Sequence, residues 1–277
     1  MSIRASVPIS SCAAFLLVLG TTPVMGARPV DVQQIIQRSV AANQADFKAA
    51  VNFNWKERDN DGKVSKTYQV TMIEGTPYNR LLAVNGKPLS KAQEAEELRK
   101  QQQTTAERRA ESPEQRRKRI EKFEKERTRD NLMMEQLTKA FNFTLTGQHK
   151  LRGFTVWMLK ATPRPGYQPP NMETQVLPGM QGQLWIDQKS YNWVKVTAEV
   201  IRPVSIEGFL AQVQPGTRFE MDKSPVGNGI WQISHFSMKS SAKILYMFNH
   251  SSQEDDTYFD YQPIANATQS AAGSSGR

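Results

Sequence analysis

The chain has 277 residues, with 36 Lys or Arg against 27 Asp or Glu and a formal net charge of +9. Its single cysteine, Cys12, lies near the N-terminus, so the rest of the chain cannot form a disulfide. Hydrophobic residues make up 38%, enough for a large core, but no apolar run reaches the ~20 residues of a membrane helix. These features exclude a disulfide-stapled fold and a helical membrane protein.

Residues 1–27 have the pattern of a secretory signal peptide. Arg4 gives a basic start, the apolar run Cys12–Leu19 follows, and Gly26 and Ala27 are small residues suited to cleavage. The pattern predicts export, and we expect a periplasmic protein. Outside the cytoplasm, a basic chain favours anionic head groups or surface polymers, and we expect no nucleic-acid partner.

Most of the remaining chain shows the alternation of apolar and polar residues that is typical of antiparallel strands. An amphipathic helix over 30–48 comes first. Hairpin patterns follow, and the clearest runs from Gly182 to Ile201 on both sides of a short polar turn. We count about ten or eleven strands by this pattern and predict an α+β fold whose sheet must cover one apolar face.

A charged insert over residues 89–138 interrupts the strands. It contains 13 Lys or Arg and 11 Asp or Glu, and Ser90 and Ser112 begin helix-start signatures, so we predict two helices. The first is nearly polar all round. The second concentrates apolar residues toward its C-terminal end, which we expect to pack on the sheet. The rest is either a solvated arm held by charge pairs or a mobile lid or docking surface.

Two other segments differ from the strand pattern. Residues 162–182 contain five prolines together with apolar side chains such as Tyr167 and Leu177, which predicts a long loop able to close over something. Residues 264–277 are of low complexity, and we predict a disordered tail. The folded domain is therefore expected to span residues 28–263.

No pattern of catalytic or metal-binding residues is present. His149, His235 and His250 are isolated in the sequence, so we expect no metal site and no cofactor. The run Glu254–Asp256 is acidic, but consecutive carboxylates do not converge like a catalytic pair, and we predict a solvated turn. We therefore predict that the protein is not an enzyme.

Several short patterns together resemble the outer-membrane lipoprotein-sorting (carrier) family, the LolA/LolB-like proteins. They are the N-terminal helix followed by Phe53 and Trp55, the run from Tyr68 to Leu82, and Gly182–Asp187 leading into the strand 194–200. The charged insert and the C-terminal tail depart from the family pattern. The chain thus resembles a divergent member.

The resemblance implies an incomplete antiparallel β-barrel that wraps an apolar cavity, with helices as a lid and acyl chains of a lipid or lipoprotein as ligand. It also implies that Arg80 contacts the lid, although an exposed charge is an equal alternative. The large apolar side chains on the predicted inner faces are candidates to line the cavity, or else to form an ordinary barrel core: Trp55, Tyr68, Val70, Met72, Leu82, Phe143, Val156, Met158, Leu184, Val194, Val196, Phe219 and Phe236.

Two other functions stay open at this stage. The first is an envelope interaction or sensor protein of the same fold, which would use the helical insert to dock a membrane-associated partner. The second is an exported hydrolase, which would require two inward carboxylates facing each other in a cleft. Among the three, the lipid or lipoprotein carrier explains export, one-sided strands and the lack of catalytic residues together.

Overall fold

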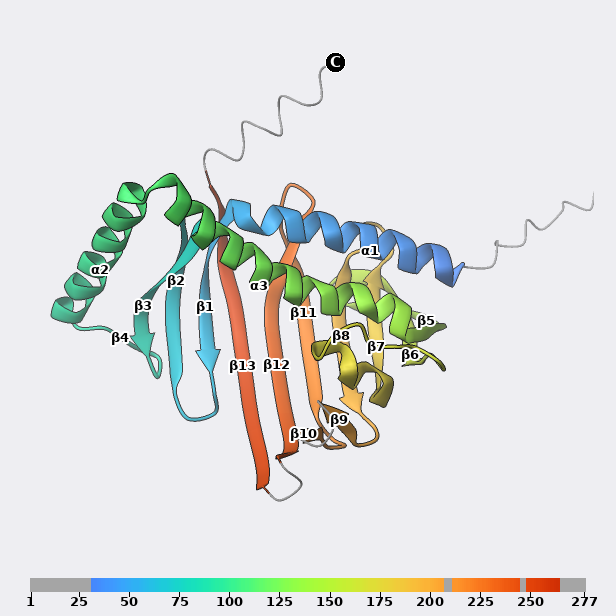
Figure 1. Cartoon of the computed structure of the whole chain (residues 1–277). Helices are drawn as coiled ribbons and strands as arrows, with labels where there is room; N and C mark the ends of the chain where they lie inside the picture. The colour runs from blue at the N-terminus through green and yellow to red at the C-terminus, as the bar shows by residue number, and fades with distance from the viewer. Residues whose placement is uncertain (1–30, 207–210, 245–247, 265–277) are drawn as a thin grey trace, which may run out of the picture. The chain divides into compact units, whose positions relative to one another are not determined.

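A single open antiparallel sheet dominates the computed structural model, which describes residues 31–206, 211–244 and 248–264 (Figure 1). Its strands are β1 (Phe53–Asn60), β2 (Ser65–Ile73), β3 (Thr76–Val84), β4 (Lys87–Pro88), β5 (Phe141–Leu151), β6 (Phe154–Pro163), β7 (Met180–Asp187), β8 (Trp193–Val200), β9 (Val204–Ile206), β10 (Ala211–Val213), β11 (Arg218–Gly227), β12 (Ile230–Ile244) and β13 (Phe248–Pro263). The predicted signal peptide and nearly all of the predicted tail lie outside the described residues.

The order of the strands leaves the sheet open at both ends. Neighbouring strands follow β4-β3-β2-β1-β13-β12-β11-β8-β7-β6-β5, and the short β9 and β10 branch off β12. Among the described residues, β4 and β5 at the two ends do not pair with each other. The prediction of an incomplete antiparallel barrel is therefore confirmed. All these elements belong to one unit that begins at Val32.

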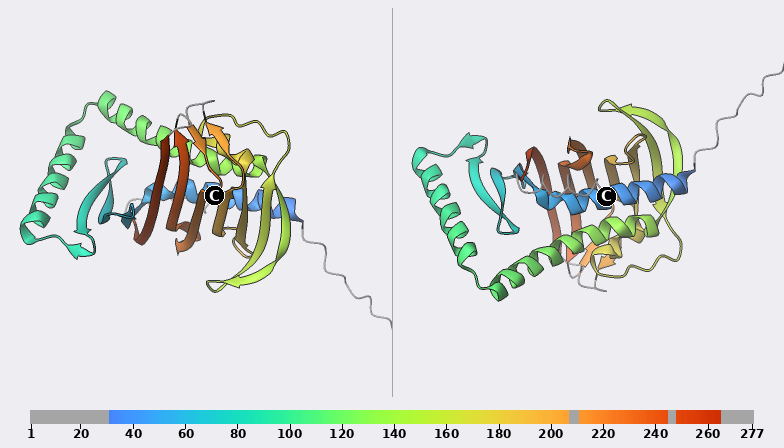
Figure 2. Two further views of the ribbon diagram at one scale, coloured as in Figure 1. Left: turned by 90° about the horizontal axis from the view of Figure 1, so that it is seen from below. Right: turned by 90° about the horizontal axis from the view of Figure 1, so that it is seen from above.

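Two long helices cross the same face of the sheet, α1 (Val32–Ala49) and α3 (Pro113–Ala140), as Figure 1 and Figure 2 show. A short 3-10 helix, η1 (Ala50–Asn52), follows α1. A second one, η2 (Glu173–Gly179), interrupts the predicted proline-rich loop. The third helix, α2 (Lys91–Ala110), lies at the β3 end of the sheet. None of the helices in the described part of the chain is long and apolar enough to cross a membrane.

The charged insert forms the two helices that the sequence predicts, and each begins with a capping box. Ser90 accepts a hydrogen bond from the backbone N–H of Gln93, and Ser112 accepts one from that of Gln115, while each glutamine side chain bonds back to the serine N–H. Pro113 fits the first turn of α3 because the missing N–H would have no helical partner there. Strong local start signals therefore mark where both helices begin.

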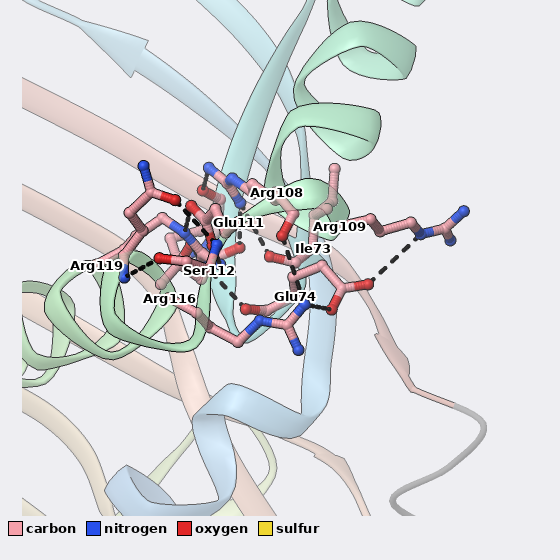
Figure 3. A network of polar contacts seen from close by, with 11 residues as sticks. Ile73, Glu74, Arg108, Arg109, Glu111, Ser112, Arg116 and Arg119 are labelled. Carbon is pink, nitrogen blue, oxygen red and sulfur yellow. Dashed lines mark hydrogen bonds and ion pairs between the residues drawn. The ribbon is translucent and has the colours of Figure 1, made fainter.

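Arginines tie the corner between α2 and α3 to the turn that joins β2 and β3 (Figure 3). The Arg108 guanidinium donates to the carbonyls of Ile73 and Thr76 at 3.0 and 2.8 Å. Arg119 donates to the Glu74 carbonyl at 3.1 Å and also forms a two-bonded pair with Glu111. The insert is therefore attached to the sheet at this corner.

Candidate functional site

The face of the sheet beneath α1 and α3, here called the covered face, is built from apolar residues that share one register. Leu184 of β7 lies opposite Val196 of β8, and Met221 of β11 lies opposite Val196 and opposite Phe236 of β12. Because side chains alternate along a strand, all four project to the same side. There they pack with Ile35 and Ile36 of α1 in one core cluster.

A small cavity of about 30 Å³ lies between the two helices, η2 and the covered face. Its lining includes Leu137 of α3, Phe143 of β5 and Trp193 at the start of β8. Pockets that hold a drug-sized ligand are usually ~300–1,000 Å³, so the interior is filled by the protein's own side chains. The described residues therefore leave no hollow cavity of the size that the family resemblance implied.

Buried polar contacts fix the C-terminal end of α1 on the sheet. Asp46 of α1 forms an ion pair of 2.6 Å with Lys223 of β11, and the two side chains are 5% and 7% exposed. The Lys223 ammonium also donates to the Asn43 side chain at 2.7 Å, and the backbone N–H of Trp231 donates to the Asp46 carboxylate at 3.0 Å. Burial lowers the pKa of Lys223, and the charge of Asp46 opposes this shift.

Helix α3 makes different contacts from those of α1. The Tyr167 hydroxyl, in the segment before η2, donates to the buried Gln136 side chain at 3.0 Å. Arg127 donates to the Phe47 carbonyl of α1 at 2.6 Å and lies over the Phe47 ring at 4.4 Å. These polar contacts join this half of α3 to α1 and to the segment between β6 and η2.

Of the thirteen predicted lining residues, Phe143, Leu184, Val196 and Phe219 lie around the cavity. Phe236 packs against the same core cluster without lining the cavity. The sequence reasoning missed Trp193, Met180 and the helix residues Ile36 and Leu137, all of which line the cavity. The apolar periodicity of the two helices was the signal that could have identified Ile36 and Leu137.

Five other predicted lining residues lie on β1 to β3, outside the cavity lining. Trp55 stacks on Tyr261 at 6.2 Å between ring centroids, and Val70 is buried. Leu82 falls at a register shift, because Leu81 pairs with Tyr68 and Ala83 with Thr67. Trp55 belongs to β1, Leu82 belongs to β3, and the other three belong to β2: Tyr68, Val70 and Met72.

Three predicted lining residues lie on the opposite side of the sheet, here called the open face. Val156 and Met158 pair with Asp187 and Trp185, whereas Leu159 pairs with Leu184 of the covered face. Val194 packs with Val156 and Trp231 in a separate cluster. Val194 lies on the open face because the β7–β8 pairing shifts register between Trp185 and Ile186. The shift places Trp193 on the covered face instead.

Arg80 is on β3, and its contact with a lid stays a prediction. It lies opposite Gln69, and its neighbours Asn79 and Leu81 pair with Val70 and Tyr68. Its buried Nε has no hydrogen-bond partner among the described residues. Arg108 and Arg119 of the insert are among the arginines that join helices to the sheet.

The acidic run predicted as a solvated turn lies within strand β13. Asp256 is only 6% exposed and accepts a hydrogen bond from the Asn60 N–H at 3.4 Å. Across the strand pair, the charge of Asp256 raises the pKa of Asp59, after the larger effect of burial. Burial, a hydrogen bond to Asp256 and the charges of Asp256 and Asp59 raise the pKa of Glu254 to about 6. Strand pairing, invisible in the sequence, brings these carboxylates together.

The raised pKa of Glu254 predicts a stability that depends on pH. The folded protein binds this proton more tightly than the unfolded chain, so this carboxyl lowers stability as pH rises from about 4.5 to about 6. Glu254→Gln should increase the free energy of unfolding at pH 7 by roughly 0.5–1 kcal/mol, a value reduced for solvent screening, and should lose its effect below about pH 4.5. Urea unfolding at several pH values measures this. Glu126→Gln, an exposed helix position, is the control, and an equal effect there would contradict the prediction.

Comparison with known proteins finds solved structures only. No protein-family model and no curated protein matches the chain. A LolA superfamily protein from Nitrosomonas europaea is similar at 11% identity and a TM-score of 0.32, over 85% of this chain and 94% of that one. A DUF1329 family protein from Desulfovibrio piger is similar at 10% identity and a TM-score of 0.29, over 84% of this chain and 93% of that one.

A third similar structure is the complex of MucA and MucB from Pseudomonas aeruginosa, where one chain matches at 9% identity and a TM-score of 0.25, over 85% of this chain and all of that one. A member of the superfamily that the sequence resembles is thus among the similar structures. All three TM-scores are below 0.5.

Proposed function

We propose that this protein binds the acyl chain of a lipid or lipoprotein on the covered face, without catalysing a reaction on it. The observation that carries the proposal is the cover itself: two helices, not a second sheet, shield an apolar sheet face and leave a small cavity lined by groups such as Phe143 and Val196. In an exported protein of the periplasm, such a face suits a hydrocarbon ligand that must be shielded from water.

An acyl chain would have to replace side chains that now fill the interior. Helix α3 is the part whose displacement opens the site, since α1 is held by the buried pair of Asp46 and Lys223. Burial of each methylene stabilises the bound state by ~0.8 kcal/mol, or on the order of 10 kcal/mol for a chain of ~14 carbons. This is enough to offset the loss of several contacts of α3.

The filled interior favours a second candidate, an envelope interaction or sensor protein that uses the charged insert as its docking surface. The cavity of about 30 Å³ has no room for an acyl chain in the closed conformation. Charge reversal at Lys91 and Arg99, which are exposed on α2 and outside the covering helix α3, separates the two functions. It should abolish binding of a membrane-associated partner in the second case and leave lipid uptake intact in the first.

The acyl-chain proposal predicts a gain of binding when the contact between α3 and the Tyr167 segment is weakened. Tyr167→Phe removes the hydrogen bond to Gln136, worth about 1 kcal/mol net, which favours the open conformation. The apparent affinity for a fluorescent fatty acid should therefore rise about fivefold. Tyr78→Phe, on β3, is the matched control and should bind like the natural protein.

Native mass spectrometry of protein purified from the exported fraction tests the same proposal directly. Reproducible masses of bound lipid, identified after extraction, would support it. A uniformly ligand-free mass, together with no fatty-acid binding by either the natural protein or Tyr167→Phe, would show that the covered face is an ordinary core.

A further inference from the structure

A cluster of metal-binding side chains lies on the open face, away from the proposed acyl-chain site. Asp222 of β11 is directly opposite His235 of β12, and Glu220 lies two residues earlier on β11, so all three project to one side. One ligand atom from each of the three lies within 4.8 Å of the others. Separation along the sequence hides this arrangement, which only the pairing of β11 with β12 creates.

Asp222 is an unusual carboxylate for a sheet surface. Its side chain is 2% exposed, and its Oδ1 has no hydrogen-bond partner among the described residues. Its other oxygen, Oδ2, accepts from the Arg152 guanidinium, which fixes the orientation of the group. Buried carboxylate oxygens are nearly always paired or bound to a metal. Because Oδ1, within the described part of the chain, lacks a hydrogen bond and has only a long ion pair with Lys195, it marks a position that a metal ion can take.

His235 is oriented like a metal ligand with an outer partner. Its Nδ1 lies 3.6 Å from Oδ2 of Asp222, inside the cluster, and its Nε2 lies 3.5 Å from Oδ1 of Asp255 on β13. Histidines that bind metals usually donate their second ring N–H to a carboxylate, which fixes the tautomer. Asp255 is in the right place to accept that proton.

A lysine now supplies positive charge to the cluster. Lys195 of β8 contacts Glu220, and its ammonium lies 3.8 Å from Oδ1 of Asp222. A metal ion would have to displace this ammonium, which is on a flexible side chain and 21% exposed. Glu220 and Asp255 also line a groove of about 830 Å³ on the open face, so the displaced lysine and the metal's remaining coordination positions have access to water.

We propose that Glu220, Asp222 and His235 bind a divalent transition-metal ion such as Zn²⁺, with Asp255 as the outer partner of His235. The imidazole nitrogen favours Zn²⁺, Co²⁺ or Ni²⁺ over Ca²⁺ and Mg²⁺, which prefer oxygen ligands alone. The site is independent of the acyl-chain proposal because it lies on the other face of the sheet.

Titration of the untagged full chain with Co²⁺ tests the proposal, since the visible absorption of bound Co²⁺ reports its ligands, and calorimetry with Zn²⁺ gives the affinity. His235→Gln and Asp222→Asn should each weaken binding by at least about tenfold. Lys195→Met should strengthen it several-fold, because the competing ammonium is gone. His149→Ala and His250→Ala, which remove exposed histidines outside the cluster, should bind like the natural protein.

Circular dichroism checks that each variant is folded. Because His235 is partly exposed, His235→Gln is the informative variant should Asp222→Asn unfold. Two results would overturn the proposal. One is Co²⁺ binding that survives His235→Gln but is lost on removal of His149 or His250. The other is no binding by either the natural protein or Lys195→Met at millimolar metal, which would mean that the cluster is only an ion-pair network.

Discussion

Asp46→Ala should lower the free energy of unfolding by about 3–5 kcal/mol, a large part of the ~5–15 kcal/mol of a typical domain. The physical reason is the Lys223 ammonium, which is 7% exposed and would lose its only ion-pair partner among the described residues. The Trp231 N–H would lose its acceptor at the same time. Urea unfolding followed by tryptophan fluorescence measures the change.

A double variant shows that the unpaired charge, and not the lost contact, causes this effect. Asp46→Leu combined with Lys223→Met removes both charges and should recover most of the stability, since buried ion pairs are often no better than apolar contacts. Glu121→Ala, which breaks an exposed pair with Arg117 on α3, should cost only ~0.3–0.5 kcal/mol. Equal losses for Asp46→Ala and Glu121→Ala would mean that the buried pair does not hold α1.

Trp193→Ala should cost about 3–5 kcal/mol, the range for loss of a large aromatic side chain from a core. Trp193 is 2% exposed, packs beneath Ile35 and Ile36 of α1, and donates its indole N–H to Ser39 at 3.3 Å. Because it lines the existing cavity, its removal also enlarges that cavity. Urea unfolding gives the loss of stability.

Trp55→Ala is the matched control for this prediction. Trp55 of β1 is half-buried and stacks on Tyr261 of the neighbouring strand β13. Its loss should cost clearly less, because a partly exposed ring buries less surface and leaves a space that water can fill. If the two tryptophan variants lost the same stability, the core beneath α1 would not be the main stabilising core of the domain.

The element order of the fold could be predicted because its signals are local. Period-two alternation gives the strands, and serine caps followed by glutamine give both helices of the insert, as Ser90 and Ser112 confirm. These patterns depend on neighbouring residues alone. They need no knowledge of which strands pair.

The composition of the candidate site could be predicted only in part, because both faces of some strands are apolar. On β6, Val156 and Leu159 are both completely buried, yet they lie on opposite faces. A register shift beside Trp193 then reverses the alternation at the start of β8. Alternation therefore cannot say which side a helix covers.

Clusters formed across strands were beyond the reach of sequence reasoning. Asp59 and Asp256, nearly two hundred positions apart, meet only because the C-terminal strand pairs with the first. The same applies to Asp222 and His235, whose pairing produces the proposed metal site. Isolated titratable residues in a β protein gain neighbours from strand order and register, neither of which the sequence displays.

The junction between α3 and β5 has a mechanical consequence. Ala140 is the last residue of the helix and Phe141 the first of the strand, and both are buried. Strand β5 is at the end of the sheet and pairs only with β6 among the described residues. A ligand that displaces α3 would therefore pull on the backbone hydrogen bonds of β5, so amide hydrogen exchange in this strand would report the opening of a site formed mainly by other elements.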